Sequence, residues 1–308
     1  MRTEDNIIQA SNLDPHDVKS PNVARLIIDG NKVIKQQTLD GLDVKVKETE
    51  DGVDVNIHLH DNITIEKPVH LCFGVLPEKG LQVINMDVVI GNNSKIKILG
   101  HCTFPNAVEV EHRMNGKIHI KEGADYSYFE RHVHSESGGT KVIPYAKILI
   151  DKEARFKTEF ELLQGRVGEM DIRYELEMGE KSLADMMARV NGKATDKIWI
   201  KESAELNGEY AKAILTSKVA VRDEAKAEVY NKITANAANS RGHVDCKEIV
   251  KDNGIATAIP IVDVRNAKAH VTHEAAVGDV DKKQLETLMS RGLEEDEASE
   301  IIIQGLLR

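Results

Sequence analysis

Hydrophobic and polar residues alternate with a period of two through most of the chain between about residues 53 and 275. Short apolar runs are separated by small polar breaks, as in VDVNIHL, KIKILG, KIHIKEG, YAKILI and GIATAIPIVDV. This period is typical of β-strands that bury one face, and few stretches of useful length show the period of a helix. The pattern therefore predicts a mainly β protein.

The polar breaks also resemble one another. Each places acidic, Gly or Asn residues before a small residue and a new strand, as in GNNSKI, KEGADY, DKEARF, MGEKSL, KESAEL, RDEAKA and KDNGIA. The small residues recur at spacings of 30, 30, 28, 22 and 21 positions: Ser94, Ala124, Ala154, Ser182, Ala204 and Ala225. Imperfect repeats of this length indicate stacked units that bury their apolar faces against their neighbours. We predict a β-solenoid, most simply a β-helix.

A β-sandwich built from hairpins is the competing architecture. It should show two-residue turns such as Asn-Gly more often than this chain does, and MNGK at residues 114–117 is one candidate hairpin. Aromatic residues make up only 4% of the chain, which suits a narrow interior of stacked Val, Ile, Leu and Ala. Both observations favour the solenoid.

The pattern changes after residue 278, where two sets of apolar residues follow helical spacing on either side of Gly292. The sets are Leu285, Leu288 and Met289, then Ala298, Ile301, Ile302 and Leu306. We predict a flanking region at 1–52, a β-helix core at 53–278 and a helical hairpin at 279–308. The hairpin either caps the open edge of the solenoid or docks a partner.

Charge and motifs exclude several classes of function. The chain has 41 Lys and Arg against 51 Asp and Glu, a net charge of -10, and no basic block, so we expect no nucleic-acid partner. No apolar run approaches the roughly 20 residues that cross a bilayer, and the segment MRTEDNIIQASNLD lacks the layout of a signal peptide. We expect no membrane association and a cytoplasmic protein. The sequence has no GxxxxGK[ST] motif, so ATP hydrolysis would belong to a partner.

Three cysteines, Cys72, Cys102 and Cys246, lie far apart and form no CxxC pair. Neither a disulfide framework nor a simple structural zinc site is suggested, so we expect reduced thiols. His101 and Cys102, together with His112, form a possible second site, although nothing in the sequence fixes the three in space.

Twelve histidines are many for 308 residues, and several alternate along strand-like segments. We interpret the pairs His58 with His60 and His132 with His134 as solvated strand faces.

The segment RNAKAHVTHEAAVGDVD places His270, His273 and Glu274 within five positions of one another. This is either a metal or catalytic site or the polar end of a sheet. On a strand, His273 and Glu274 point to opposite faces, so both can bind one centre only where the strand ends or bulges.

One long segment carries a family resemblance. Residues 260–307, PIVDVRNAKAHVTHEAAVGDVDKKQLETLMSRGLEEDEASEIIIQGLL, resemble the C-terminal signature of the SufB/SufD family of iron-sulfur cluster assembly proteins, through HEA, QL, SRG and EA at the family's spacing. The resemblance implies a right-handed parallel β-helix with small helical regions, and C-terminal helices that bind the ABC-type ATPase SufC. It identifies the chain as a short SufB/SufD-type member.

The resemblance also implies site residues. His273 occupies the position of a histidine implicated in building the cluster at the SufB–SufD interface, and Glu274 matches its acidic neighbour in SufB. Cys246 lies within one alignment position of a SufB cysteine thought to accept sulfur or hold the nascent cluster. Cys246, His273 and Glu274 would therefore bind a transient iron-sulfur cluster, with Cys246 and His273 as metal ligands.

The sequence also departs from the family's pattern. SufB has a second cysteine on an earlier coil, which receives persulfide, and the corresponding stretch here, YAKILIDKEARF, has none. Thr272 stands where SufB has a glutamate. Mixed SufB-like and SufD-like features and a short chain are consistent with a minimal system, in which one protein forms a homodimer through its β-helix with two copies of the ATPase.

Two functions follow as hypotheses. The first is a non-catalytic scaffold that takes iron and sulfur from donors, assembles nascent clusters at the homodimer interface and transfers them, driven by SufC bound at Leu285, Leu288, Ile301 and Ile302. The second is a β-helix enzyme acting on polysaccharide. The low aromatic content and the start of the sequence favour the first.

Overall fold

The computed structural model of the chain describes residues 3–308. Two helices, α1 (Thr3–Ala10) and α2 (Pro15–Lys19), precede the strands, and α3 (Lys282–Met289) and α4 (Glu295–Leu307) follow them. The first sheet has ten strands, in the spatial order β19 (His270–Asp279), β17 (Arg241–Val250), β15 (Lys212–Val221), β13 (Leu183–Gly192), β11 (Arg155–Gln164), β9 (Asp125–His134), β7 (Lys95–Phe104), β5 (Val69–Gly74), β1 (Arg25–Asp29) and β2 (Lys32–Gln37). The second has nine, in the order β18 (Ile255–Val264), β16 (Lys226–Ala235), β14 (Lys197–Leu206), β12 (Gly168–Met178), β10 (Thr140–Ile150), β8 (Glu109–Ile120), β6 (Lys79–Ile90), β4 (Gly52–Leu59) and β3 (Leu42–Glu48).

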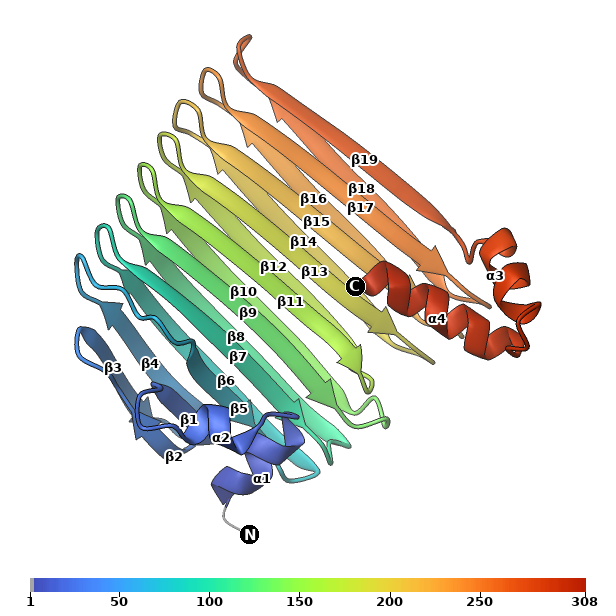
Figure 1. Cartoon of the computed structure of the whole chain (residues 1–308), viewed down its shortest axis with the longest axis horizontal. Helices are drawn as coiled ribbons and strands as arrows, with labels where there is room; N and C mark the ends of the chain where they lie inside the picture. The colour runs from blue at the N-terminus through green and yellow to red at the C-terminus, as the bar shows by residue number, and fades with distance from the viewer. Residues whose placement is uncertain (1–2) are drawn as a thin grey trace.

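From β4 onward, successive strands alternate between the two sheets, so that strands two apart in the chain are parallel neighbours (Figure 1). The chain thus forms a β-solenoid of about eight turns, as the period of two and the repeated breaks predicted. The parallel ladder runs in regular register, for example from Lys95 to Asp125, Arg155 and Leu183.

The stacked turns explain the repeat in the sequence. A fully buried small residue precedes most odd-numbered strands, and the residue before it has a positive φ: Ser94, Ala124, Ala154, Ser182, Ala211 and Ser240 follow Asn93, Gly123, Glu153, Lys181, Tyr210 and Asn239. Neighbouring turns are hydrogen-bonded, since Gly123 N donates to Lys152 O at 3.0 Å and Glu153 N to Glu180 O at 2.8 Å. A side chain larger than Ser or Ala would separate the turns.

The predicted repeat was wrong after Ser182. Ala204 lies inside β14, and Ala225 precedes β16 in the second sheet. The first-sheet positions are Ala211 and Ser240 instead, so the true coil length stays at 28–30 residues. The candidate hairpin at residues 114–117, which would have favoured the sandwich, is not formed. These residues lie within β8, where Asn115 donates from Nδ2 to Asn85 Oδ1 of β6 at 3.0 Å.

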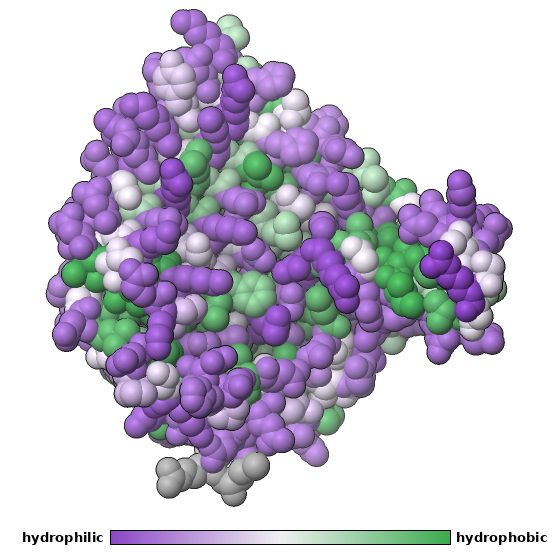
Figure 2. Space-filling view, in the orientation of Figure 1, coloured by the Kyte–Doolittle hydropathy of each residue, from purple (hydrophilic) through white to green (hydrophobic). Residues whose placement is uncertain are grey.

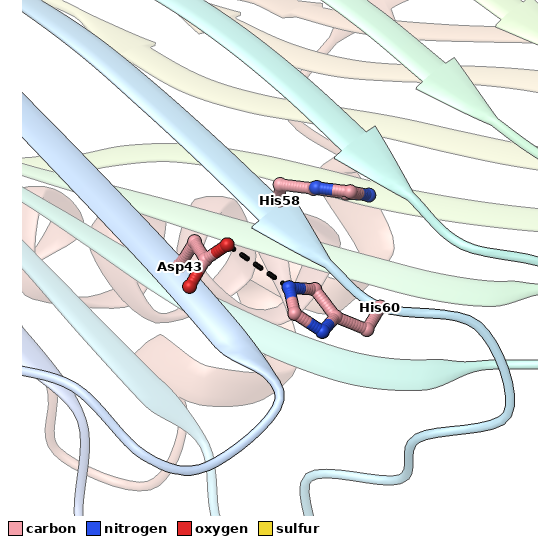
Figure 3. A group of neighbouring side chains, drawn as sticks. All are labelled: Asp43, His58 and His60. Carbon is pink, nitrogen blue, oxygen red and sulfur yellow. Dashed lines mark hydrogen bonds and ion pairs between the residues drawn. The ribbon is translucent and has the colours of Figure 1, made fainter.

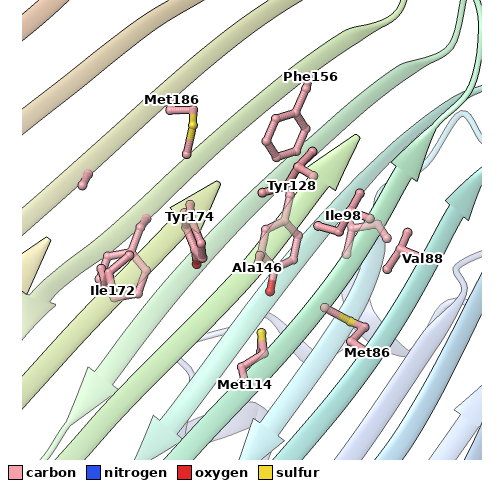
Figure 4. Close-up of a cluster of buried hydrophobic side chains, with 14 of the residues drawn as sticks. Met86, Val88, Ile98, Met114, Tyr128, Ala146, Phe156, Ile172, Tyr174 and Met186 are labelled. Atoms are coloured by element: carbon pink, nitrogen blue, oxygen red, sulfur yellow. The ribbon is translucent and has the colours of Figure 1, made fainter. Parts of the chain in front are cut away.

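The core lies between the two sheets, where every second side chain points inward. Its central part holds more rings and methionines than predicted for a narrow interior, among them Met86, Met114, Tyr128, Phe156 and Tyr174 (Figure 4). Small neighbours make the room: a Cβ on Gly100 would lie 2.7 Å from the Tyr128 hydroxyl. The aromatic residues are few, but most of them are inside.

The two ends of the solenoid differ. At the N-terminal end, β2 and β3 pair antiparallel with β1 and β4, and α1 packs Ile7 and Ile8 against Ile27. The first 52 residues therefore add strands to both sheets. At the C-terminal end, the described chain has no coil after β18 and β19, and residues 272–279 are exposed.

Of the two C-terminal helices, α4 lies on the outer face of the first sheet and α3 lies beyond the ends of its strands (Figure 1). Ile303 and Leu307 of α4 pack against Ala220 of β15, and Arg189 of β13 donates to the Leu307 carbonyl at 3.4 Å. α3 begins at Asp281, whose side chain accepts a hydrogen bond from Gln284 N at 2.8 Å. The helices thus form the predicted hairpin, while β19 stays uncovered.

No helix among residues 3–308 is long and apolar enough to cross a bilayer.

Candidate iron and cluster site

Cys246 and His273 lie on neighbouring strands and point toward the same interior. In the ladder between β17 and β19, His273 pairs with Val244, and Ala275 pairs with Cys246. The two candidate ligands are therefore two residues out of register on one face, with Cα atoms roughly 8 Å apart from ordinary strand spacing and rise. Cys246 is fully buried, whereas His273 is exposed because its coil is the last one.

Glu274 lies on the opposite face. It pairs with Asp245, whose carboxylate accepts from Lys247 Nζ at 2.9 Å. Hydrogen bonding to Asp245, with a smaller contribution from Glu274, raises the pKa of Lys247. β17 and β19 pair without a register shift across residues 241–279, so within this range no bulge turns Glu274 toward His273. Of the three predicted cluster ligands, Cys246 and His273 thus lie on the inner face of the solenoid and Glu274 lies on its outer face.

Further polar groups surround Cys246 in the interior. Its thiol accepts from Asn231 Nδ2 of β16 at 3.8 Å, and Ser217 of β15 pairs with it in the ladder. Glu248 lies two residues further along β17, and its carboxylate accepts from Ser217 Oγ at 3.5 Å. Glu202 of β14 pairs with Asn231. We call Glu202, Ser217, Asn231, Cys246 and Glu248 the end cluster.

Burial changes the acidity of the end cluster. It raises the pKa of Glu202 to about 8 and that of Glu248 to about 7, and it is also the main cause of the raised pKa of Cys246. These groups therefore favour their protonated forms until a cation balances their charge. Sequence reasoning missed Glu202, Asn231 and Glu248. The sequence could have shown them as polar residues at inward positions of a strand, such as Glu202 in KIWIKESAEL and Asn231 in KAEVYNKITA.

The possible second site is only partly formed as predicted. Cys102 and His112 meet inside the solenoid, with Sγ and Nε2 3.7 Å apart. His101 points outward instead and contacts His70, because successive strand residues face opposite ways. Burial raises the pKa of Cys102 well above its usual value and lowers that of His112 to about 3.

The two histidine pairs have different environments. His58 and His60 are exposed as predicted, and Nε2 of His60, just after β4, contacts Asp43 Oδ2 of β3 at 2.9 Å (Figure 3). That hydrogen bond lowers the pKa of Asp43. The prediction for His132 and His134 was wrong. Both are buried, because they share the inward face of β9 with Tyr126 and Tyr128.

The predicted partner-binding residues line or adjoin a groove between the C-terminal helices. Leu288, Ile301 and Ile302 line this groove of about 770 Å³ together with Ile249 of β17, and Leu285 lies one turn earlier on α3. Ile301 is 47% exposed. Figure 2 shows apolar residues gathered at the end of the molecule that α3 and α4 form.

Comparison with known proteins places the chain in a family. The family model described as SUF system FeS cluster assembly, SufBD core domain, matches residues 76–306. The chain is 38% identical to an iron-sulfur cluster assembly SufBD family protein of Methanocaldococcus jannaschii over 95% of this chain and 93% of that one. It is 36% identical to one of Pyrococcus horikoshii over 92% of this chain and 87% of that one.

A shorter match connects the chain to a bacterial protein. It is 36% identical to the iron-sulfur cluster assembly protein SufB of Bacillus subtilis over 72 residues, which are 23% of this chain and 16% of that protein. The chain belongs to the SufBD family. This membership supports a role in iron-sulfur cluster assembly.

Proposed function

We propose that the protein is a non-catalytic scaffold of a SUF system, which assembles nascent iron-sulfur clusters and passes them on. The placement of Cys246 and His273 on one inner face at the open end of the solenoid carries this proposal. Thiolate and imidazole are ligands for iron and for iron-sulfur clusters, and the end cluster adds carboxylates that suit incoming iron. Glu274 would act from the outer face, as a neighbour of Asp245 and Lys247 rather than as a ligand of the same iron.

The scaffold would work as a homodimer joined at the last coils. β18 and β19 present unpaired backbone groups along one side, and such edges invite pairing with another chain. Val262, Val264 and Val277 are exposed there, although each lies at an inward position of its strand. A two-fold axis at this edge would place two copies of His273 and two of Cys246 about one interface.

A dimer would supply more cluster ligands than one chain can. Iron-sulfur clusters are commonly held by four cysteines, and each chain offers one thiol near the open edge. Two thiols and two imidazoles from a dimer make a four-ligand set. Iron and sulfide would come from separate donors, and the cluster would be cargo for a recipient protein.

A SufC-type ABC ATPase would bind at α3 and α4. The groove lined by Leu288, Ile301 and Ile302 offers apolar surface between α3 and α4, and α4 rests against the outer face of the first sheet. Arg222 and Lys251 tie α4 to that sheet through ion pairs with Glu300 and Asp296. Movement of docked ATPases would thus be transmitted to β15 and β17, and the latter carries Cys246. The setting would be cytoplasmic.

Anaerobic reconstitution with iron and sulfide tests the proposal. We would compare Cys246→Ser and His273→Ala with two matched controls, Cys72→Ser in the N-terminal apolar cluster and His270→Ala on the outer face of β19. The expected result is loss of cluster absorbance, iron and sulfide in the first pair and retention in the controls. Full retention in both site variants, with folded dimers, would overturn the proposal.

A further inference from the structure

A group of metal-ligating side chains lies inside the solenoid, far from the open edge. The ligand atoms of Cys102 on β7 and of Glu130 and His132 on β9 all lie within 4.8 Å of one another, and all three residues are buried. Cys102 and Cys246 are separated by five strand spacings, roughly 24 Å. One metal ion cannot contact both cysteines.

We propose that Cys102, His112, Glu130 and His132 bind a single divalent transition-metal ion, Zn²⁺ or Fe²⁺, in the interior of the β7–β9 coils. We call these four residues the interior site. A thiolate, two imidazoles and a carboxylate form a ligand set that selects first-row metals over Mg²⁺ or Ca²⁺.

Hydrogen bonds turn the metal-binding nitrogen of His112 toward Cys102. Gln82 donates from Nε2 to the carbonyls of Gly30 at 2.8 Å and Gly74 at 3.0 Å, so its Oε1 is the atom that faces His112. His112 Nδ1 donates to this oxygen at 2.9 Å. The proton of the neutral ring is therefore on Nδ1, and the lone pair of Nε2 points to Cys102 Sγ.

A second chain of hydrogen bonds turns the metal-binding nitrogen of His132 toward the site. The Arg166 carbonyl can only accept, so His134 Nδ1 donates to it at 3.2 Å and His134 Nε2 accepts from His132 Nδ1 at 3.1 Å. His132 Nε2 then faces Glu130 Oε1 at 2.7 Å. Metal-binding histidines usually donate their other ring N–H in this way, which fixes the tautomer and the ring orientation.

The distances from Cys102 fit a tetrahedral ion, whereas His112 is outside the group within 4.8 Å and its ring would move toward Glu130 and His132 on binding. Cys102 Sγ lies 3.7 Å from His112 Nε2 and 3.7 Å from Glu130 Oε1. When a sulfur and a nitrogen bind one tetrahedral metal ion at ordinary zinc bond lengths, the two ligand atoms lie about 3.6 Å apart. The shorter contact between His132 and Glu130 holds one shared proton, and an ion that replaced this proton would separate the two atoms by several tenths of an ångström.

Glu130 supplies an independent sign that a ligand is expected. Its Oε2 is buried and accepts no hydrogen bond of ordinary geometry among residues 3–308, although the Tyr128 hydroxyl lies near enough to help lower the pKa of this carboxyl. Such an unsatisfied oxygen is costly for a carboxylate. The rings of Phe104 and Phe160 pack against His132 and exclude water from it. A divalent ion with one thiolate and one carboxylate leaves no net charge in this apolar surrounding.

Refolding the full chain with one equivalent of Co²⁺ tests the site, because a buried ion would be taken up most readily as the coils form. We would use Cys72→Ser/Cys246→Ser, in which Cys102 is the only thiol. The expected spectrum shows a sulfur-to-cobalt charge-transfer band and the strong visible bands of tetrahedral Co²⁺. Adding Cys102→Ser should abolish the charge-transfer band, and Glu130→Gln should lower the affinity at least tenfold.

A second measurement uses the unaltered chain, so that it does not depend on the folding of a variant. X-ray absorption at the metal edge, after refolding with Zn²⁺ or with Fe²⁺ under anaerobic conditions, should give one sulfur neighbour and three nitrogen or oxygen neighbours. Absence of sulfur scattering with both metals, or a cobalt–sulfur band that survives Cys102→Ser, overturns the interior site. Because the cobalt variant already lacks Cys246, the cobalt result is distinct from the test of the open-edge site.

Discussion

His273 pairs with Val244 across β19 and β17, and the two side chains point into the same interior, yet Val244 is fully buried and His273 is exposed. The difference has one cause: Val244 is covered by the coil of β18 and β19, whereas no described coil follows to cover His273. An inward position without a next coil is accessible to a second molecule. The last coil therefore combines candidate ligands with an incomplete core.

Charging this incomplete core should prevent self-association. Val277 is 49% exposed at an inward position of β19, and we expect Val277→Asp to convert a dimer into a monomer, because a carboxylate buried in the joined interior would lack a partner. Light scattering during gel filtration measures the change. Val108→Asp is the matched control, since Val108 is 55% exposed in the turn before β8, far from the last coil. A dimer of unchanged stability in Val277→Asp would contradict the prediction.

The solenoid itself was predictable, because its strands repeat one simple rule. Alternation with a period of two marks the faces, and the polar turns mark the breaks. The register between coils was less accessible, since strands of both sheets look alike in sequence. For this reason Ala204 and Ala225 were assigned to the wrong turns.

The interior polar residues were harder to predict, because polarity and position conflict. His132 is an even number of residues away from Tyr126 and Tyr128, so it lies on the same face of β9. This spacing predicts its burial better than the polar character of its ring does. The contact of Cys102 with His112 joins two sheets, so no pattern along one strand could show it. Cys246 and His273 were predicted from resemblance to a family. The alternation of side chains along β19 is enough to place Glu274 on the opposite face.

The stacked turns predict a stabilising substitution. Glu153 has φ 57°, a left-handed conformation that disfavours side chains with a Cβ, and its side chain is exposed. Glu153→Gly should raise the free energy of unfolding by up to about 1 kcal/mol, measured by urea denaturation. Lys157→Gly, two residues into β11, should lower it by roughly 0.5–1 kcal/mol. Destabilisation by Glu153→Gly would show that its side chain contributes more than the strained backbone costs.

Docking of the ATPase should depend on the helical groove. Ile301→Asp should weaken binding of a SufC-type ATPase at least tenfold, because a charge replaces an apolar contact at the centre of the surface. Titration calorimetry with the purified ATPase measures the affinity. Ile214→Asp on β15 is the control, because Ile214 is 45% exposed and Ile301 47%. Equal affinities for the two variants would place the ATPase elsewhere.

Stability should fall as the pH rises, because of Glu202. Burial raises the pKa of its carboxyl to about 8, above the ordinary value of 4.5, so the folded protein keeps a proton that the unfolded chain releases. The stabilisation is complete below about pH 4.5 and is lost by about pH 8, a change on the order of a few kcal/mol. Glu248 adds a smaller change in the same direction, since its pKa is raised to about 7.

Glu202→Gln isolates this contribution. The neutral amide has nearly the same shape and does not titrate, so the variant should match the parent near pH 5 and exceed its free energy of unfolding near pH 8. Urea denaturation at both pH values gives the two differences, and Glu205→Gln on the outer face of β14 is the matched control. If parent and Glu202→Gln lose stability in parallel between pH 5 and pH 8, the Glu202 carboxyl is ionised in the folded protein, and a cation or a water-filled space must lie beside it.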